Sequence, residues 1–253
     1  MPTSRNGSSI KPHPLILSSS HPQMIETSIH DLRDLSAPPE ADAVVVIDVL
    51  RAFSTAAAAI DRGALEIYPV LDVADAFARR AHEPDLILMG ETDCHPVPGF
   101  DLGNSPVAAA AFPFQGKRAV QRTTAGTRGL VCCAASRSLW AASFLVASST
   151  VAAIQAEDPK RVAFVITGTV HYGSADEDLA CAEWMASLLR GNPLPVDPFL
   201  QRVRNSVAAA TFLDPATTLF APADVDFCAR ADIFSFGMKV DPAGLVLKAL
   251  RLS

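Results

Sequence analysis

A continuous apolar run from Ala43 to Val49 (AVVVIDV) constrains the fold of this chain more than any other feature. The run has the length of a strand and is apolar at every position except Asp48, as is typical of a strand covered on both faces. Further strand-length runs alternate with helical segments of about ten residues. This alternation predicts an α/β fold, a three-layer α/β/α sandwich around a largely parallel or mixed sheet.

The same reading predicts the order of elements and the extent of the domain. Expected strands span 43–49, 66–70, 86–89, 118–122, 138–143, 161–167 and 233–238. Expected helices span 54–61, 73–81, 128–135, 147–156, 176–190 and 199–212. Residues 1–23, rich in Ser, Pro and His, are expected to be a flexible extension. Residues 24–253 would then form one domain, with two intertwined α/β halves as the alternative arrangement.

Charge and cysteine content narrow the function classes. The formal net charge is −6, whereas a non-specific nucleic-acid binder normally has a basic surplus. An anionic ligand would therefore need a local cluster of arginines. The five cysteines include no CxxC pair, which favours reduced thiols in a cytoplasmic protein. No segment has the length and apolarity of a membrane span or a secretion signal.

Several familiar catalytic patterns are missing from the sequence. There is no G-x-x-x-x-G-K-[ST], no G-x-G-x-x-G and no G-x-S-x-G. No cysteine has an arginine six positions later, which excludes the loop of cysteine phosphatases. Asp48 is followed two positions later by Leu50 rather than by a second Asp, so the aspartyl-phosphate hydrolase pattern lacks its acid/base partner. Without H-x-H or HExxH, a histidine-built zinc site is not expected.

A first candidate motif, IDVLRAFST, follows the buried strand at 43–49. Asp48 lies at the end of this strand, where open α/β sheets bind their ligands. A carboxylate beside Arg51 and just before a helix suits a metal ion or a phosphate. In the alternative interpretation, Ser54 is an ordinary helix N-cap and Asp48 forms a structural ion pair with Arg51.

A second candidate motif, QRTTAGTRG, joins an expected strand to an expected helix. Backbone N–H groups at a helix N-terminus form a natural oxyanion site. Gly126 would allow the backbone to approach a ligand closely, and the Arg128 guanidinium matches the geometry of a phosphate or sulfonate. The alternative is a capped turn in which Thr127 is the N-cap.

Two further segments carry acidic and polar side chains. Asp176, Glu177 and Asp178 follow an expected strand and offer the oxygen ligands that Mg²⁺ prefers. Alternatively, Ser174 and Glu177 form a capping box. The long loop 90–106 adds Glu91, Asp101, Asn104 and Ser105, although D-L-G-N-S-P also fits an Asx-type turn. His95 and His171, alone in their loops, are expected to be solvated.

Five ordered motifs together resemble those of the 2-phosphosulfolactate phosphatase family. They are IDVLRAFST (47–55), GFDLGNSP (99–106), TTAGTRG (123–129), ASFLVAS (142–148) and TGT with S-x-x-ED (167–178). The resemblance implies a Mg²⁺-dependent phosphatase with an α/β fold. Its reaction would convert (2R)-2-phospho-3-sulfolactate to 3-sulfolactate and phosphate, a step toward coenzyme M.

The matching positions yield a set of expected site residues. The expected catalytic residues are Asp48, Arg51, Arg128 and Asp178. The expected substrate-binding residues are Ser54, Thr55, Asn104, Ser105, Thr123, Thr124, Gly126, Thr127 and Ser143. The expected Mg²⁺ ligands are Asp48, Glu177 and Asp178, with Glu91 as a lesser candidate. Ala125, Ala142 and Val146 stand where the family usually has Asn, Gly and Asn, and Thr92 where it often has Arg.

The departures from the family pattern leave the substrate open. A phosphate, a sulfonate and a carboxylate together carry about four negative charges, so the ligand needs Mg²⁺ and several cationic or N–H donors. The alternatives are a phosphatase for another small anionic 2-phospho acid and a non-catalytic anion-binding homologue. Direct attack by water and a phospho-enzyme formed on Asp48 are both compatible with these residues. Low charge content also leaves apolar surface that a homodimer would cover.

Overall fold

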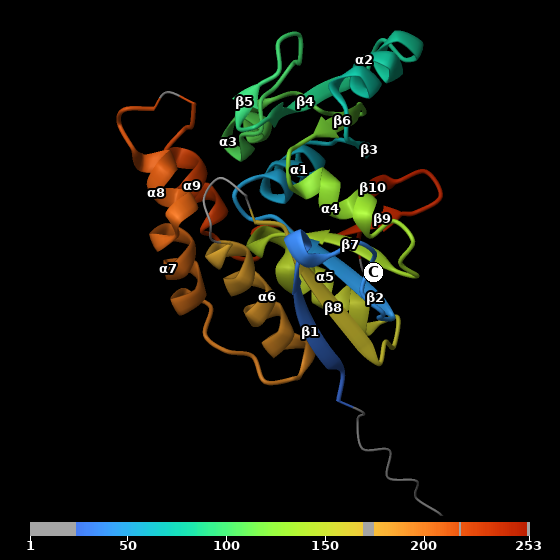
Figure 1. Cartoon of the computed structure of the whole chain (residues 1–253), viewed down its shortest axis with the longest axis vertical. Helices are drawn as coiled ribbons and strands as arrows, with labels where there is room; N and C mark the ends of the chain where they lie inside the picture. Colours follow the sequence, from blue (N-terminus) through green and yellow to red (C-terminus); the bar gives the residue numbers. More distant parts are fainter. Residues whose placement is uncertain (1–23, 169–174, 218, 252–253) are drawn as a thin grey trace, which may run out of the picture.

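A mixed β-sheet flanked by helices forms the centre of the protein. The computed structural model describes residues 24–168, 175–217 and 219–251. In this part of the chain the sheet has ten strands in the order β1-β8-β2-β7-β9-β10-β3-β6-β4-β5 (Figure 1). The expectation of an α/β fold with a three-layer sandwich around a mixed sheet is therefore confirmed.

The strands and helices have the following bounds. The strands are β1 (Glu26–Asp31), β2 (Ala43–Ile47), β3 (Glu66–Val70), β4 (Ile87–Thr92), β5 (His95–Pro96), β6 (Arg118–Arg122), β7 (Leu139–Ala142), β8 (Arg161–Ile166), β9 (Gly237–Asp241) and β10 (Val246–Leu250). The α-helices are α1 (Ala52–Asp61), α2 (Val73–His82), α3 (Pro106–Ala111), α4 (Gly126–Cys132), α5 (Ala147–Gln155), α6 (Asp176–Leu189), α7 (Asp197–Asn205), α8 (Val207–Leu213) and α9 (Ala223–Cys228).

The sheet contains two groups of parallel strands. β1, β8, β2 and β7 form one group, and β3, β6 and β4 form the other. The antiparallel pair β9–β10 lies between them and bonds to β7 on one side and β3 on the other. In Figure 1 the second group lies with α2 above, the first lies with α5 and α6 below, and α1 and α4 lie between them.

β2 shows how the sequence specifies the layers. All five of its residues are buried. Val44 and Val46 pack into the core on one face of the sheet, with residues of α1 and α4. Ala43, Val45 and Ile47 pack into the core on the other face, with residues of α5 and α6. A strand covered on both faces needs apolar side chains at every position, which is why the run at 43–49 lacks polar alternation.

The strands and helices predicted from the sequence agree well with those of the structure where the apolar pattern is strong. β3 and β6 have the expected bounds, and α1 begins two residues earlier than expected. The helix expected at 199–212 is instead two helices, because the chain bends at Ser206, whose hydroxyl accepts a hydrogen bond from the N–H of Ala209. The strand expected at 233–238 begins only at Gly237. The sequence prediction also missed β1, β5, β10, α3 and α9.

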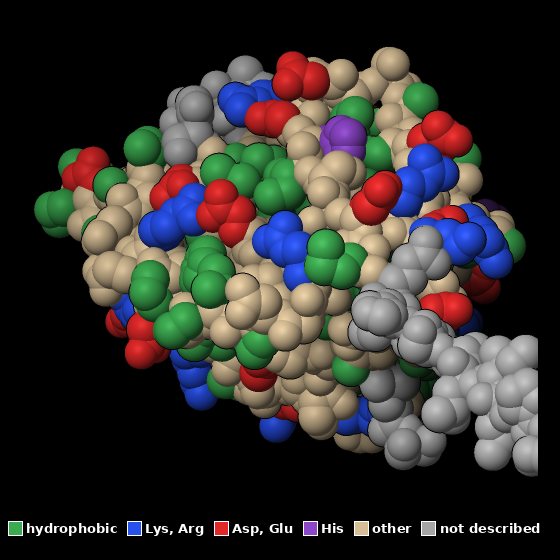
Figure 2. All heavy atoms as spheres, turned by 90° about the horizontal axis from the view of Figure 1, so that it is seen from below, with side chains coloured by type: hydrophobic (Ala, Val, Ile, Leu, Met, Phe, Trp, Pro, Cys, Tyr) green, Lys and Arg blue, Asp and Glu red, His purple; other side chains and the backbone are tan. Residues whose placement is uncertain are grey.

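The surface and the chain start complete the description. The segment 1–23, expected to be flexible, lies outside the described residues. No helix in the described residues combines the length and the apolarity that a membrane span requires. On the face opposite β4 and β5, Lys and Arg side chains are interspersed with Asp and Glu and do not form a basic stripe (Figure 2).

Candidate active site

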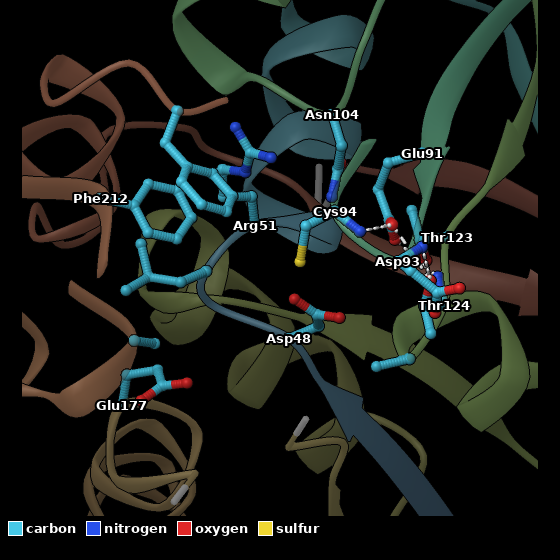
Figure 3. A pocket seen from close by; sticks show the side chains of 14 residues that line it. Asp48, Arg51, Glu91, Asp93, Cys94, Asn104, Thr123, Thr124, Glu177 and Phe212 are labelled. Carbon is cyan, nitrogen blue, oxygen red and sulfur yellow. Dashed lines mark hydrogen bonds between the residues drawn. The ribbon is translucent and has the colours of Figure 1, made fainter. Parts of the chain in front are cut away.

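A pocket lies where the segments that follow strands of both parallel groups meet (Figure 3). These segments follow β2, β4 and β6, and helices α6 and α8 close the other side. The lining residues are Asp48, Leu50, Arg51, Glu91, Asp93, Cys94, Asn104, Thr123, Thr124, Ala125, Glu177, Ala208, Phe212 and Phe220. A second hollow shares five of these residues and extends the pocket outward past Ser105 and Ala221.

Asp48 lies at the base of this pocket, between the starts of two helices. Its Oδ1 accepts a hydrogen bond of 2.9 Å from the N–H of Ala52, the first residue of α1. On the other side, a Cβ at Gly126 would come within 2.8 Å of Asp48 Oδ2 and 2.6 Å of the Ala52 Cβ. Only glycine therefore lets the start of α4 lie this close to the Asp48 carboxylate.

The turn before α4 is held by threonine side chains. Thr123 Oγ1 accepts a 3.1 Å hydrogen bond from the N–H of Thr127, and the Thr127 hydroxyl donates to the Thr123 carbonyl at 2.6 Å. Ala125 occupies the N-cap position of α4, so the interpretation of Thr127 as the N-cap is wrong. Thr123 and Thr124 line the pocket, whereas Thr127 supports the turn from behind.

Glu91 connects β4 to this turn. Its Oε1 accepts a 2.6 Å hydrogen bond from the N–H of Thr124, and its Oε2 accepts from the Thr124 hydroxyl and from the N–H of Cys94. Both carboxylate oxygens are thus engaged by donors of the protein. Glu91 lines the pocket, but its contacts are those of a residue that fixes two loops.

Arg51 is the only Lys or Arg in the described lining of the pocket. Its side chain is buried, with the guanidinium 4.8 Å from the centre of the Phe212 ring and 5.1 Å from that of Phe220. Its Nη1 donates a 2.9 Å hydrogen bond to Asp224 Oδ2. The ion-pair partner of Arg51 is thus Asp224, which corrects the alternative that paired Arg51 with Asp48.

Burial of acidic groups dominates the electrostatics of the pocket. Burial raises the pKa of Asp48 to about 6, and the nearby Glu91 carboxylate adds to the rise. Burial likewise raises the pKa of Glu177 to about 7, assisted by the negative charge of Asp48. Perturbed carboxyl groups that share a pocket are typical of catalytic and metal-binding sites.

Two buried acceptors in the pocket have no hydrogen-bond partner in the described residues. They are Glu177 Oε2 and Asn104 Oδ1, on side chains that are only 5% and 7% exposed. Buried polar atoms are normally satisfied, so these two atoms indicate that a ligand completes the site. An acceptor without a donor is suited to a cation or to a protonated group of a substrate.

Asp178 lies behind the pocket and does not belong to its lining. Its Oδ1 accepts a 2.7 Å hydrogen bond from the N–H of Val49. Its Oδ2 accepts at 3.2 Å from the N–H and hydroxyl of Thr167 and from the N–H of Gly168. These bonds hold the end of β2 against the end of β8, and burial raises the pKa of Asp178. The structure thus shows a positioning role, while metal ligation by Asp178 stays a prediction.

The other expected residues divide between the pocket and its surroundings. Asn104 lines the pocket, and Ser105 lines its outward extension. Three expected residues are buried outside the lining, namely Ser54, Thr55 and Ser143. Ser54 lies inside α1, where its hydroxyl donates to the carbonyl of Val49 before the helix, and it is not the N-cap of that helix. Arg128 is exposed on α4 and does not belong to the lining.

The predictions for the loop 90–106 and for the segment before α6 agree only in part with the structure. Glu91 belongs to β4, so the loop expected from Gly90 begins as strand, and His95 lies exposed in β5. Asp101 accepts from the N–H of Leu88 and pairs with Arg80, away from the pocket. His171 and the Ser174 part of the capping box lie outside the described residues.

A bound divalent cation fits two of the four carboxylates that the sequence predicts as Mg²⁺ ligands. Among residues 24–168, 175–217 and 219–251, no three His, Cys, Asp or Glu side chains form a ready metal cage. The oxygens of Glu91 and Asp178 are engaged by protein donors, whereas Glu177 Oε2 has no partner among these residues. Since Mg²⁺ needs only one or two carboxylates besides water and phosphate, Asp48 and Glu177 fit this ion.

Comparison with known proteins agrees with this picture. A family model described as 2-phosphosulpholactate phosphatase matches residues 29–241. A probable 2-phosphosulfolactate phosphatase of Bacillus subtilis (strain 168) is 34% identical over 209 residues, which is 81% of this chain and 90% of the relative. One from Prochlorococcus marinus is 32% identical over 166 residues, covering 65% and 68%. One from Deinococcus radiodurans is 44% identical over 86 residues, covering 34% and 36%.

An α/β fold with this pocket and these relatives defines the class of the protein as a phosphoric monoester hydrolase. The chain belongs to the 2-phosphosulfolactate phosphatase family, which confirms the resemblance of its five motifs.

Proposed function

We propose that the protein is a Mg²⁺-dependent, cytoplasmic phosphatase that converts 2-phospho-3-sulfolactate to 3-sulfolactate and phosphate, as in coenzyme M biosynthesis. The observation that carries the proposal is the pair of buried carboxyl groups, Asp48 and Glu177, that lines the same pocket as the buried Arg51. The names of the relatives support the same activity.

In this proposal, each residue of the pocket has a distinct role in the reaction. Arg51 binds phosphoryl oxygens, because it is the permanent cation of the described lining. Asp48 and Glu177 hold Mg²⁺, which when bound would polarise the phosphoryl group. Thr123 and Thr124 form the wall beside Asp48, and the amide of Asn104 is available to a polar group of the substrate.

Glu177 has the properties of a proton acceptor. With a pKa of about 7, a substantial fraction of its carboxyl groups is ionised near neutral pH. As an alternative to holding Mg²⁺, its Oε2, which has no protein donor in the described residues, is available to a water molecule. In the direct mechanism, a water oxygen forms a bond to phosphorus and gives a proton to Glu177 while the bond between phosphorus and the substrate oxygen breaks. The protonated Glu177 carboxyl can then return this proton to the leaving oxygen, which gives the product hydroxyl. A phospho-enzyme formed on Asp48 is the alternative.

The composition of the pocket favours a second candidate substrate class. One permanent cation faces four carboxyl groups in the described lining, and Leu50, Ala208, Phe212 and Phe220 form an apolar wall. A 2-phospho acid without a sulfonate has less negative charge to neutralise. Ala125, where the family usually has Asn, lines the same pocket.

A substrate panel tests both candidates. Purified protein is incubated with 2-phosphosulfolactate, phosphoglycolate, 2-phosphoglycerate and 2-phospholactate, each with Mg²⁺ or with EDTA. We expect phosphate release with Mg²⁺ and none with EDTA. Faster turnover of a sulfonate-free ester would establish the second candidate. A calorimetric binding signal without turnover of any ester would contradict the enzymatic proposal and identify an anion-binding homologue.

A further inference from the structure

We infer that Asp224 is a positioning residue that fixes the Arg51 guanidinium in the pocket; this inference rests on the proposed function. Asp224 belongs to α9, beyond the five sequence motifs, and is completely buried. It does not line the pocket itself. Its effect on the reaction would therefore act through Arg51, with which it forms the 2.9 Å ion pair.

Asp224 joins three segments that are far apart in the sequence. Its Oδ2 accepts from Arg51 in the turn after β2. Its Oδ1 accepts a 2.6 Å hydrogen bond from the Ser105 hydroxyl and a longer one, 3.4 Å, from the N–H of Val107 at the start of α3. Both carboxylate oxygens are thus used, and each is held by a different element. A carboxylate constrained in this way presents a fixed direction to the guanidinium.

Two aromatic rings restrict the guanidinium further. Phe212 and Phe220 stack with 4.2 Å between their centres, and Arg51 lies over both rings. The rings limit sideways movement, and the Asp224 carboxylate selects the rotation of the guanidinium plane. Among the described residues no other ion pair or hydrogen bond of the Arg51 side chain is found, so its remaining N–H groups are available to the pocket.

Stability alone does not explain this arrangement. A buried ion pair often contributes no more to stability than apolar residues of similar volume, because both charges lose their hydration. Here one member of the pair lines the pocket and the other does not. A fixed guanidinium binds an oxyanion without first losing its rotational freedom, which gives the pair a role in the reaction.

The test compares Asp224→Asn with wild type in both structure and kinetics. The Nε–H signal of Arg51 in an NMR spectrum, assigned by its loss in Arg51→Lys, reports the order of the guanidinium without any substrate. We expect Asp224→Asn to broaden or shift this signal and to lower kcat/KM about tenfold, mostly through KM. Asp232→Asn, which alters an Asp bonded to Ser148 outside the pocket, should change neither readout.

A double-mutant cycle separates positioning from a general structural effect. If Asp224 acts through Arg51, Asp224→Asn should change kcat/KM less than about twofold in the Arg51→Lys background. An unchanged Arg51 signal, or an equal loss in both backgrounds, would overturn the inference.

Two further measurements cover the cases in which Asp224→Asn does not fold or the wild-type protein is inactive. If Asp224→Asn does not fold, Ser105→Ala loosens Asp224 from its other side and should shift the Arg51 signal in the same direction. An unchanged signal in that variant would overturn the inference too. If the wild-type protein releases no phosphate, the proposed function fails, while the Arg51 signal still decides whether Asp224 fixes the guanidinium.

Discussion

At the scale of single residues, substitutions of Arg51 and of Arg128 are expected to affect catalysis differently. Both follow motif turns, but only Arg51 lines the pocket, whereas Arg128 is exposed on α4. We expect Arg51→Lys to lower kcat/KM roughly 10²-fold, about 2.7 kcal/mol of transition-state stabilisation, because lysine lacks the planar fork. Steady-state kinetics of Arg51→Lys and Arg128→Lys test this, and we expect the smaller loss of kcat/KM in Arg128→Lys. An equal loss in Arg128→Lys would restore the role that the TTAGTRG motif predicts for Arg128.

Gly126 provides a second test, because its missing side chain makes room for Asp48. Gly126→Ala places a methyl group within 2.8 Å of Asp48 Oδ2 and 2.6 Å of the Ala52 Cβ. We expect at least a tenfold loss of kcat and a destabilisation of about 1–3 kcal/mol from overpacking. Gly129→Ala is the matched variant, since its Cβ would meet Val46 at 2.6 Å on the same helix without touching Asp48. Gly129→Ala should lower the melting temperature but retain more activity than Gly126→Ala. A greater loss of activity in Gly129→Ala than in Gly126→Ala would contradict this account.

The sequence predicts individual site residues where motif and topology coincide. Asp48 and Arg51 follow β2, and Thr123 and Thr124 follow β6, so the rule that ligands bind at strand carboxyl ends identifies each pair separately. Their convergence in one pocket joins two strand groups of opposite direction and was not predictable from the motifs. Phe212, Phe220 and Asp224 were not predicted. Phe212 and Asp224 belong to the short helices α8 and α9, and Phe220 lies in the segment between these helices. All three lie outside the motifs, and only the three-dimensional packing brings them to Arg51.

At the scale of elements, Asp178 determines how β2 and β8 end together. Its carboxylate accepts from the N–H groups of Val49, Thr167 and Gly168. Asp178→Ala leaves the buried N–H groups of Val49 and Gly168 without their acceptor, whereas the N–H of Thr167 keeps its 3.2 Å hydrogen bond to the Ile47 carbonyl. We expect a loss of about 2–4 kcal/mol in the free energy of unfolding. Urea denaturation measures this. Asp42→Ala removes an acceptor of two exposed backbone N–H groups and should cost less than about 1 kcal/mol. Equal losses in the two variants would contradict a special role for Asp178.

The elements also show which signals a sequence carries. β2 is recognisable because burial on both faces requires an unbroken apolar run, whereas β3 (EIYPV) and β6 (RAVQR) are only partly buried and have shorter apolar stretches. β1 (ETSIHD) was missed because it is an edge strand whose side chains are half exposed, so it has no such run. α3 was missed because the sequence prediction extends the loop 90–106 to Pro106, the first residue of this helix, although proline is well tolerated in the first helical turn.

At the scale of the whole molecule, the relation between the two parallel groups was not predictable from local patterns. Alternating strands and helices predict parallel pairing within each group. They do not reveal that β9 and β10, from the C-terminal part, lie between the groups and reverse the direction of the second one. The pocket depends on this arrangement, because its lining combines segments that follow β2 with segments that follow β4 and β6.

The raised pKa values of the buried acids should make the stability of the whole protein depend on pH. Folding raises the pKa of Asp48 from 3.8 to about 6 and that of Glu177 from 4.5 to about 7. Between about pH 4 and pH 7 the folded state therefore holds more protons than the unfolded state, so the free energy of unfolding falls as pH rises. At one pKa unit per 1.36 kcal/mol, the fall is on the order of 3 kcal/mol per group. Below this window Asp48 and Glu177 are protonated in both states, and above it the penalty from these two groups is constant.

Under the proposed function, Mg²⁺ would offset this penalty by binding the ionised carboxylates of the folded state. We expect millimolar Mg²⁺ to raise the melting temperature at about pH 7.5 and to have little effect at about pH 5. Thermal unfolding in EDTA and in Mg²⁺ across this pH range measures both effects. Asp48→Asn should flatten the profile recorded in EDTA and reduce the shift caused by Mg²⁺. A flat wild-type profile in EDTA would show that these carboxyl groups are not protonated in the folded protein, and an equal Mg²⁺ shift in Asp48→Asn would place the ion elsewhere.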